Sequence, residues 1–184
     1  MAPAISPVKV DEPPESSNII LPGMARERRE SERAIRDWAE ETRRQGRDLT
    51  LMTLDVSEMT SETWAYRFII AADPVAERCT LLFYGARFAA LMGLPQKPDI
   101  SVPMVDQIPA RYVPVFAKGC MNATAQDAPV RMQGAVCRED GQQELYRAVF
   151  IPFKVKPDGQ LPLAFGAFNC RIVEAQALAL ADPT

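Results

Sequence analysis

The stretch from residue 66 to residue 94 constrains the fold of this chain more than any other. Residues 64–71 and residues 78–84 are each rich in aromatic and β-branched side chains, which is typical of β-strands. The dipeptide Asp73-Pro74 between them is a turn signal. The sequence therefore predicts that these two segments form a β-hairpin.

A short helix is expected directly after the hairpin. Side chains three and four positions apart share one face of a helix, and Phe88, Leu91 and Met92 have this spacing. Gly93 follows them and is well suited to end the helix, because glycine readily adopts the left-handed conformation of a C-terminal cap. Two short strands and a glycine-terminated helix are thus predicted in sequence.

A loop and a second helical region follow. Residues 95–103 contain three prolines, which predicts a loop, with one helical turn near 102–106. Pro109 is well placed as the first residue of a longer helix, and Pro114 still falls in its first turn. The apolar stripe of this helix consists of Tyr112, Val115, Phe116, Gly119 and Cys120.

Three consecutive strands are predicted in the C-terminal half. Residues 130–138, 144–155 and 161–173 carry aromatic and β-branched side chains, and glycine-containing turn signals separate them. Pro152 inside the middle strand predicts a sheet edge or a β-bulge at that point. Strands joined by such short turns form an antiparallel meander, so we expect an α+β fold.

The chain divides into four predicted segments. Residues 1–22 contain five prolines, and we expect a disordered or strap-like tail. Residues 23–63 should form a helix and a linker, because 24–45 lack glycine and proline and are rich in helix formers. The folded domain is expected at 64–174, with a C-terminal tail at 175–184.

The N-terminal helix has a narrow apolar stripe that includes Ile35 and Trp38. A helix that is polar on most of its surface usually packs on something by one edge. Two interpretations stay open. The helix lies on its own domain, or it forms a dimer through Ile35 and Trp38.

Composition excludes several functions. Histidine is absent from the 184 residues, which excludes Ser-His-Asp and Cys-His catalysis and haem bound through histidine. The four cysteines form no C-x-x-C pair, so we expect no metal site and interpret them as free thiols, some of them in the core. A net charge of −3 gives no reason to expect nucleic-acid binding. The sequence shows neither a signal peptide nor an apolar run of the roughly 18 residues that span a membrane, so we predict a cytoplasmic location.

The predicted order β-β-α-α-α-β-β-β resembles a PAS domain over about residues 64–173. Residues 84–93 are similar to the strand-to-helix step of PAS domains, where Asn-x-x-Phe commonly leads into Leu-x-Gly; Gly85 stands at the asparagine position. Residues 165–172 look like the last strand of the family but lack its common Asp-Ile-Thr ending. The chain also looks like the divergent single-domain PAS proteins of alphaproteobacteria.

This resemblance implies a five-stranded antiparallel sheet that curves around short helices, preceded by an N-terminal helical extension. The hollow between sheet and helices can hold a small hydrophobic ligand. The residues that would face it are Phe88, Met92, Met104, Tyr112, Phe116 and Cys120. The alternative is that these side chains simply fill the core. No cofactor is expected, because the cysteine motif of flavin-binding PAS domains lies on a helix, whereas Asn169-Cys170-Arg171 lies on a predicted strand.

The resemblance also implies a function. We expect a stand-alone sensory or regulatory module in signal transduction that is not an enzyme, forms a homodimer and contacts an unidentified signalling protein. The helix at 24–45 occupies the position that often packs in PAS dimers. Two alternatives stay open: an isomerase or dehydratase with an α+β cone fold that uses Asp106 and Tyr112, and a structural dimer whose hollow is packed shut.

Overall fold

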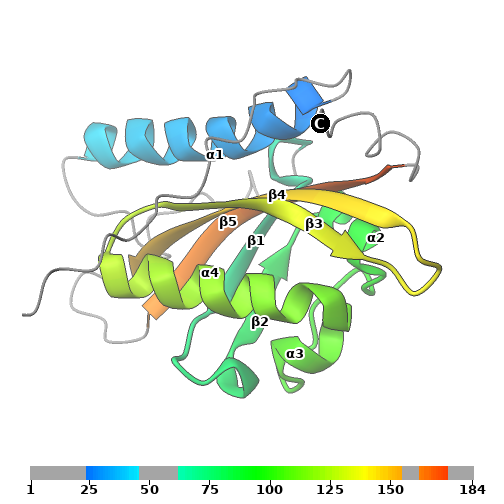
Figure 1. Cartoon of the computed structure of the whole chain (residues 1–184). Coiled ribbons are helices and arrows are strands. Elements are labelled where there is room, and N and C mark those ends of the chain that lie inside the picture. The colour runs from blue at the N-terminus through cyan, green and yellow to red at the C-terminus, as the bar shows by residue number, and fades with distance from the viewer. Residues whose placement is uncertain (1–23, 46–61, 155–161, 174–184) are drawn as a thin grey trace, which may run out of the picture.

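The computed structural model describes residues 24–45, 62–154 and 162–173 (Figure 1). The predicted tails, the linker after the first helix and the turn before the last strand lie largely or wholly outside these residues. The elements in chain order are α1 (Met24–Gln45), η3 (Glu62–Trp64), β1 (Arg67–Ala71), η4 (Ala76–Arg78), β2 (Thr80–Tyr84), α2 (Ala86–Met92), α3 (Met104–Gln107), η5 (Ala110–Tyr112), α4 (Val113–Gln126), β3 (Val130–Cys137), β4 (Gln143–Lys154) and β5 (Pro162–Val173).

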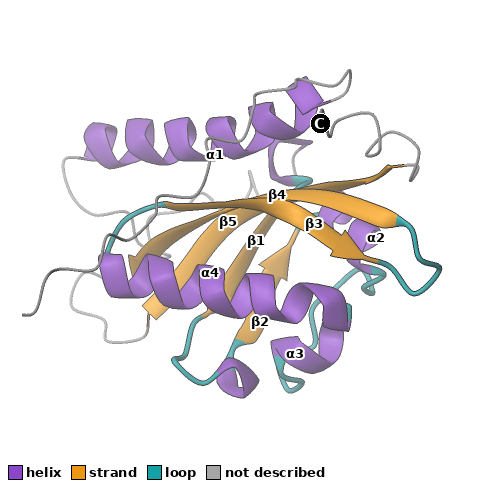
Figure 2. Ribbon diagram, viewed as in Figure 1, coloured by secondary structure: helices purple, strands orange, loops and turns teal. Residues whose placement is uncertain are grey.

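The five strands form one antiparallel sheet in the order β2-β1-β5-β4-β3. Helices α2, α3 and α4 pack on one face of this sheet, which we call the inner face, and α1 lies on the opposite, outer face (Figure 2). The predicted α+β fold with a five-stranded antiparallel sheet is therefore confirmed. The predicted hairpin (β1 and β2) and the predicted meander (β3, β4 and β5) meet at the β1–β5 pair in the middle of the sheet.

The helix ends follow the predicted backbone chemistry. Gly93 caps α2 in the left-handed conformation, with φ 67° and ψ 29°, as expected. Asp127 ends α4 with φ 48°, and Pro114 lies in the first turn of that helix. The predicted helix start at Pro109 is wrong, because the 3-10 turn η5 precedes α4, which begins only at Val113.

Two strands begin later than predicted. Trp64 is not in the first strand, which begins at Arg67, because Trp64 ends the 3-10 turn η3. Its ring is buried against Phe83 and Phe165 on the outer face, at centroid distances of 5.5 and 5.3 Å. The second strand begins at Thr80, because η4 occupies Ala76–Arg78.

Pro152 is tolerated in β4 because the neighbouring strand β3 does not extend to it. β4 lies between β3 and β5, but its pairing with β3 ends where Phe150 meets Val130. Pro152 pairs only with Ala164 of β5. A proline cannot donate a backbone hydrogen bond, and here β3 offers no partner for that position. The expected local sheet edge is confirmed.

Helix α1 lies on its own domain, where it packs against β4 and β5. Ala34 is fully buried there, and Ile35 and Trp38 are half-buried against the same apolar cluster. Asp37 of the helix forms an ion pair with Arg67 of β1. The helix therefore lies on its own domain, with Ile35 and Trp38 turned toward the outer face of the sheet, and a dimer through these two residues stays a prediction.

Candidate ligand site on the inner face

The six residues predicted to face a hollow lie together in one apolar cluster on the inner face, and none is more than 4% exposed. They come from four consecutive elements. Phe88 and Met92 are on α2, Met104 is on α3, Tyr112 is in η5, and Phe116 and Cys120 are on α4.

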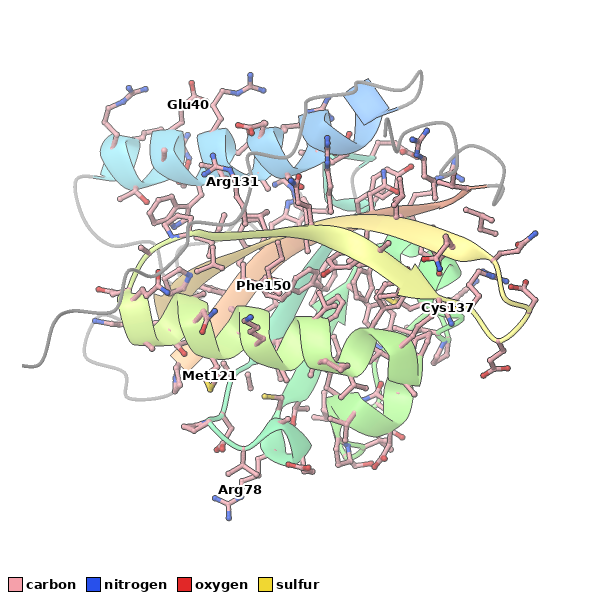
Figure 3. All side chains as sticks on the ribbon, in the orientation of Figure 1. Glu40, Arg78, Met121, Arg131, Cys137 and Phe150 are labelled. Atoms are coloured by element: carbon pink, nitrogen blue, oxygen red, sulfur yellow. The ribbon has the colours of Figure 1, made fainter. Side chains whose placement is uncertain are left out.

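Aromatic rings from the strands complete this cluster. Phe68 of β1 contacts Phe88, Phe116 and Phe150, with ring centroids 5.1–5.4 Å apart. Phe168 of β5 contacts Phe116 at 5.5 Å. Figure 3 shows Phe150 between the sheet and α4. Sequence reasoning missed these strand residues, although their alternation along each strand already assigned them to one face.

A polar group closes one end of the apolar cluster. Glu144 of β4 points to the inner face, and its side chain is only 6% exposed. Its Oε2 accepts a hydrogen bond from Nε of Arg111 at 2.9 Å, and its Oε1 accepts one from Sγ of Cys170 at 3.2 Å. Arg138 lies at the same carboxylate, with Nη1 3.8 Å from Oε1. This group was not predicted; the signal was a carboxylate in phase with the inward-facing Tyr146, Ala148 and Phe150.

The protonation states of this group follow from its contacts. Burial acts to raise the pKa of Glu144, but hydrogen bonds from Cys170, Tyr112 and Arg111, in that order, outweigh burial and hold that pKa below its usual value. Burial raises the pKa of Cys170 to about 12. The carboxylate is therefore ionised near neutral pH, and the thiol is a protonated donor rather than a nucleophile.

Two tyrosine hydroxyls are buried inside the cluster. The hydroxyl of Tyr84 has no hydrogen-bond partner among the described residues, whereas that of Tyr112 lies beside Glu144 and Cys170 and helps to lower the pKa of the Glu144 carboxyl. Tyr84 is 4% exposed and Tyr112 is fully buried. Burial raises the pKa of both, and in Tyr112 the nearby Cys170 and Glu144 raise it further. Both hydroxyls are thus neutral donors. Leaving a buried donor such as the Tyr84 hydroxyl unpaired costs about 1–3 kcal/mol.

The cysteines are free thiols and some of them lie in the core, as the sequence predicted. All four are free thiols; Cys79, Cys120 and Cys170 are buried and Cys137 is exposed. Burial raises the pKa of Cys79 and Cys120. The buried thiols therefore belong to the apolar core.

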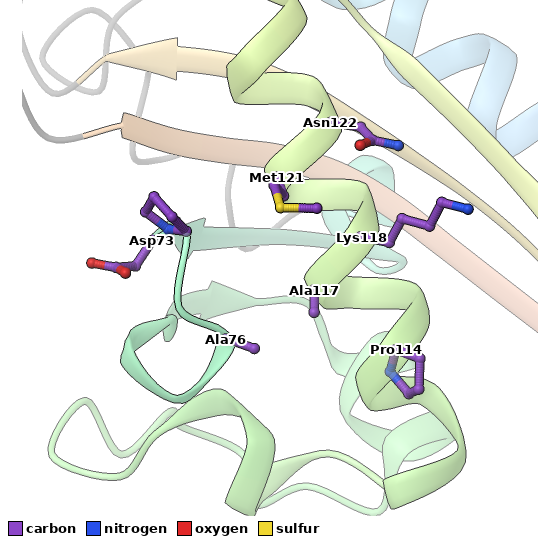
Figure 4. Close-up of a pocket in the computed structure, with 8 residues that line it drawn as sticks. Asp73, Ala76, Pro114, Ala117, Lys118, Met121 and Asn122 are labelled. Atoms are coloured by element: carbon purple, nitrogen blue, oxygen red, sulfur yellow. The ribbon is translucent and has the colours of Figure 1, made fainter.

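A separate pocket of about 390 Å³ opens on the outside of α4, beside the connection between β1 and β2 (Figure 4). It is lined by Asp73, Pro74, Ala76, Pro114, Ala117, Lys118, Met121 and Asn122. The Asp73 carboxylate is engaged in its own turn, where it accepts a hydrogen bond from the Val75 amide at 2.8 Å. None of the six predicted residues lines this pocket.

The residues of the enzyme alternative occupy different environments. Asp106 is exposed on α3, whereas Tyr112 is fully buried. Within the described ranges, no three or more cysteine, aspartate or glutamate side chains are arranged to hold a metal ion. No helix in the described part of the chain is long and apolar enough to cross a bilayer.

Neither protein-family models nor curated proteins match the sequence. Among solved structures, a PAS domain from Colwellia psychrerythraea is similar at 12% identity and a TM-score of 0.42, covering 65% of this chain and 98% of that one. VqmA of Vibrio cholerae is similar at 14% identity and a TM-score of 0.45, covering 70% of this chain. The match spans 53% of VqmA, about half its length. The Drosophila melanogaster Cycle PAS-B domain, with bound ethylene glycol, is similar at 11% identity and a TM-score of 0.36, covering 58% of this chain and 99% of that one.

The element order and the sheet topology define the class of this domain. A five-stranded antiparallel sheet is interrupted after β2 by three helices that pack on its inner face. This is a PAS-like domain, as the sequence resemblance implied.

Proposed function

We propose that this chain is a regulatory module of signal transduction whose PAS-like domain binds a small, largely apolar molecule on the inner face of the sheet. The observation that carries this proposal is the buried hydroxyl of Tyr84, which has no hydrogen-bond partner among the described residues and lies inside an otherwise apolar cluster. A ligand that bears a hydrogen-bond acceptor would satisfy this donor. The unpaired donor would then be a feature retained for binding.

The walls of the proposed site are the six inward-facing residues of α2, α3, η5 and α4. Met92 and Met104 are the adaptable members, because a methionine side chain is unbranched and repacks readily around a guest. Glu144, held by Arg111, fixes the polar end of the site. A ligand with a polar group directed to this end and an apolar body among the phenylalanines fits the chemistry of the lining.

The module would act through contacts with other proteins, as a homodimer in the cytoplasm and without catalysis of its own. The outer face of the sheet carries α1, so a ligand that alters the packing of the inner face can alter the helix on the other side. The strands that join the two faces are β4 and β5, which contact both α1 and α4.

The test is native mass spectrometry of the protein purified from its own host. A retained small molecule is expected, and Tyr84→Phe should weaken its binding by about two- to tenfold, the equivalent of one hydrogen bond. Tyr66→Phe is the matched control, because Tyr66 is half-exposed and lies outside the inner cluster. A protein that carries no ligand, and in which Tyr84→Phe increases stability, would contradict the proposal.

A further inference from the structure

The two edges of the sheet differ in how well they are protected against pairing with a further strand. The sheet ends in β2 on one side and in β3 on the other. β2 has five residues, and its pairing with β1 shifts register between Ile69 and Ile70. Short, irregular edges are poor templates for further strand pairing.

β3 has none of these protections. It has eight residues, it pairs with β4 without a register shift, and it contains no proline. Arg131 is its one charged residue. Among the described residues, no backbone hydrogen bond joins β3 to any segment other than β4. An edge of this kind is an available site for pairing with another strand.

The inward-facing side chains continue the apolar core out to this edge. Met132 and Val136 of β3 are half-buried and pack against the inner cluster. Tyr146 of β4 is also half-buried, and its ring lies beside Gly134, where a Cβ atom would be only 3.0 Å from the tyrosine hydroxyl. The glycine therefore leaves the tyrosine ring uncovered on the side of the open edge.

The outward-facing side chains of the strand are exposed. Gln133, Ala135 and Cys137 are exposed, and α1 reaches this strand through an ion pair of 3.6 Å between Glu32 and Arg131. Arg131 and Cys137 lie at opposite ends of the strand (Figure 3). The central part of the edge is accessible on both faces of the sheet.

We infer that β3 pairs antiparallel with β3 of a second copy of this chain, about a two-fold axis at Gly134, so that the two sheets become continuous. Around this axis Met132 lies opposite Val136 of the partner subunit, and Gln133 lies opposite Ala135 of the partner subunit. Arg131 lies opposite Cys137 of the partner subunit. Opposite residues share a face, as antiparallel pairing requires.

The pattern favours a second copy because it is self-complementary. Apolar side chains meet apolar side chains on the inner side, and no like charges face each other on the outer side. The absent side chain of Gly134 leaves room at the axis for the Tyr146 rings of both subunits. In contrast, the stripe of Ile35 and Trp38 is already used by the domain's own sheet. This inference rests on the homodimer in the proposed function and identifies its interface.

Strand pairing alone buries less surface than a standard protein interface, so the dimer should be weak and concentration-dependent. A matched pair of variants tests it by sedimentation equilibrium over a concentration series. Gln133→Lys/Ala135→Lys places lysines opposite each other twice and should weaken the dimer by on the order of tenfold. Gln133→Lys/Ala135→Glu places opposite charges there and should restore or tighten it. Both positions are exposed, and both variants place the same lysine opposite Arg147 of β4, so any effect of that lysine on the fold is common to the two.

Equal dimer dissociation constants for the two variants would overturn the inference, because the interface then lies elsewhere. A wild-type chain that stays monomeric at every concentration would overturn it as well. That second result would also remove the homodimer from the proposed function. Ligand retention would still be judged separately by native mass spectrometry.

A disulfide test fixes the register. Arg131→Cys places a thiol opposite the native Cys137 of the partner subunit, and mild oxidation should yield a covalent dimer. The two thiols within one chain are about 20 Å apart along an extended strand, too far to join each other. Wild type, with its exposed Cys137, and Lys118→Cys on the outside of α4 are the controls. Cross-linking no faster than in these controls would refute the proposed register.

Discussion

The ion pair between Asp37 of α1 and Arg67 of β1 provides a quantitative test of how the helix is held. The Arg67 side chain is 7% exposed, and its guanidinium lies 5.4 Å from the ring centroid of Trp64 and 5.6 Å from that of Phe165. Removing one partner of a buried ion pair costs about 3–5 kcal/mol. Asp37 is itself 33% exposed, and detachment of α1 would return Arg67 to water. We therefore expect Asp37→Asn to lower the free energy of unfolding by about 1–3 kcal/mol.

The opposite substitution should cost less. In Arg67→Met the remaining Asp37 can turn toward solvent, and the methionine side chain keeps the apolar contacts with Trp64 and Phe165. The double variant Asp37→Asn/Arg67→Met should be more stable than Asp37→Asn alone, because no unpaired charge stays buried. Glu32→Gln is the control on the same helix. Its pair with Arg131 has side chains 51% and 58% exposed, and its loss should cost less than about 1 kcal/mol.

Urea denaturation followed by tryptophan fluorescence measures these differences. Trp38 is on α1 and Trp64 lies in the outer cluster that the helix covers, so both report the docked helix. A double-mutant cycle separates the coupling of the pair from the effect of each substitution. If Glu32→Gln destabilises the protein as much as Asp37→Asn, or if the double variant is as unstable as Asp37→Asn, the reasoning from burial is refuted.

Three further predictions concern the inner face and the helix. In Gly119→Ala the new Cβ atom would lie 2.2 Å from the Phe150 ring, so the free energy of unfolding in urea should fall by about 1–3 kcal/mol, after a partial gain from the better helix propensity of alanine. A variant that is more stable than wild type would contradict this packing. Glu144→Gln should remove an acid-dependent part of the stability. Since the folded-state pKa of Glu144 is lowered, its contribution is present above the usual value of 4.5 and is lost as the pH falls through the folded pKa, so wild type and variant should converge in denaturation curves at low pH. Trp38→Ala should lower stability by about 2 kcal/mol yet leave the dimer dissociation constant unchanged in sedimentation, whereas a monomeric variant would return the interface to α1.

The order of elements could be predicted because each signal is local. The aromatic and β-branched runs, the spacing of Phe88 and Met92, and the left-handed Gly93 depend only on near neighbours in the chain. The errors at Trp64 and Pro109 also have a local cause. Both belong to or border 3-10 turns, whose short apolar segments resemble the start of a strand or helix.

The candidate site could be predicted only on its helical side. Their spacing of four residues alone assigns Tyr112, Phe116 and Cys120 to one face of a helix, and the arrangement of the sheet is not needed for this. The polar end required the register between strands as well. Glu144 lies opposite Ile172, two pairs along from the pairing of Tyr146 with Cys170, and 26 residues separate the carboxylate from the thiol that donates to it. Arg111 reaches the same carboxylate from 33 residues away.

The position of α1 shows why a stripe of apolar residues does not identify its partner. Ile35 and Trp38 are compatible with a dimer seam or with the domain's own sheet, since both offer an apolar surface. The residue that favours the domain's own sheet is Arg67, which is charged and begins the apolar strand β1. Its side chain would be buried on the outer face without an ionic partner unless a carboxylate lay against it. Asp37 lies one position before Trp38 and supplies that carboxylate. Because this pair holds the helix on its own sheet, the edge of β3 is the surface that we propose for a second copy, and a search for the dimer should begin there.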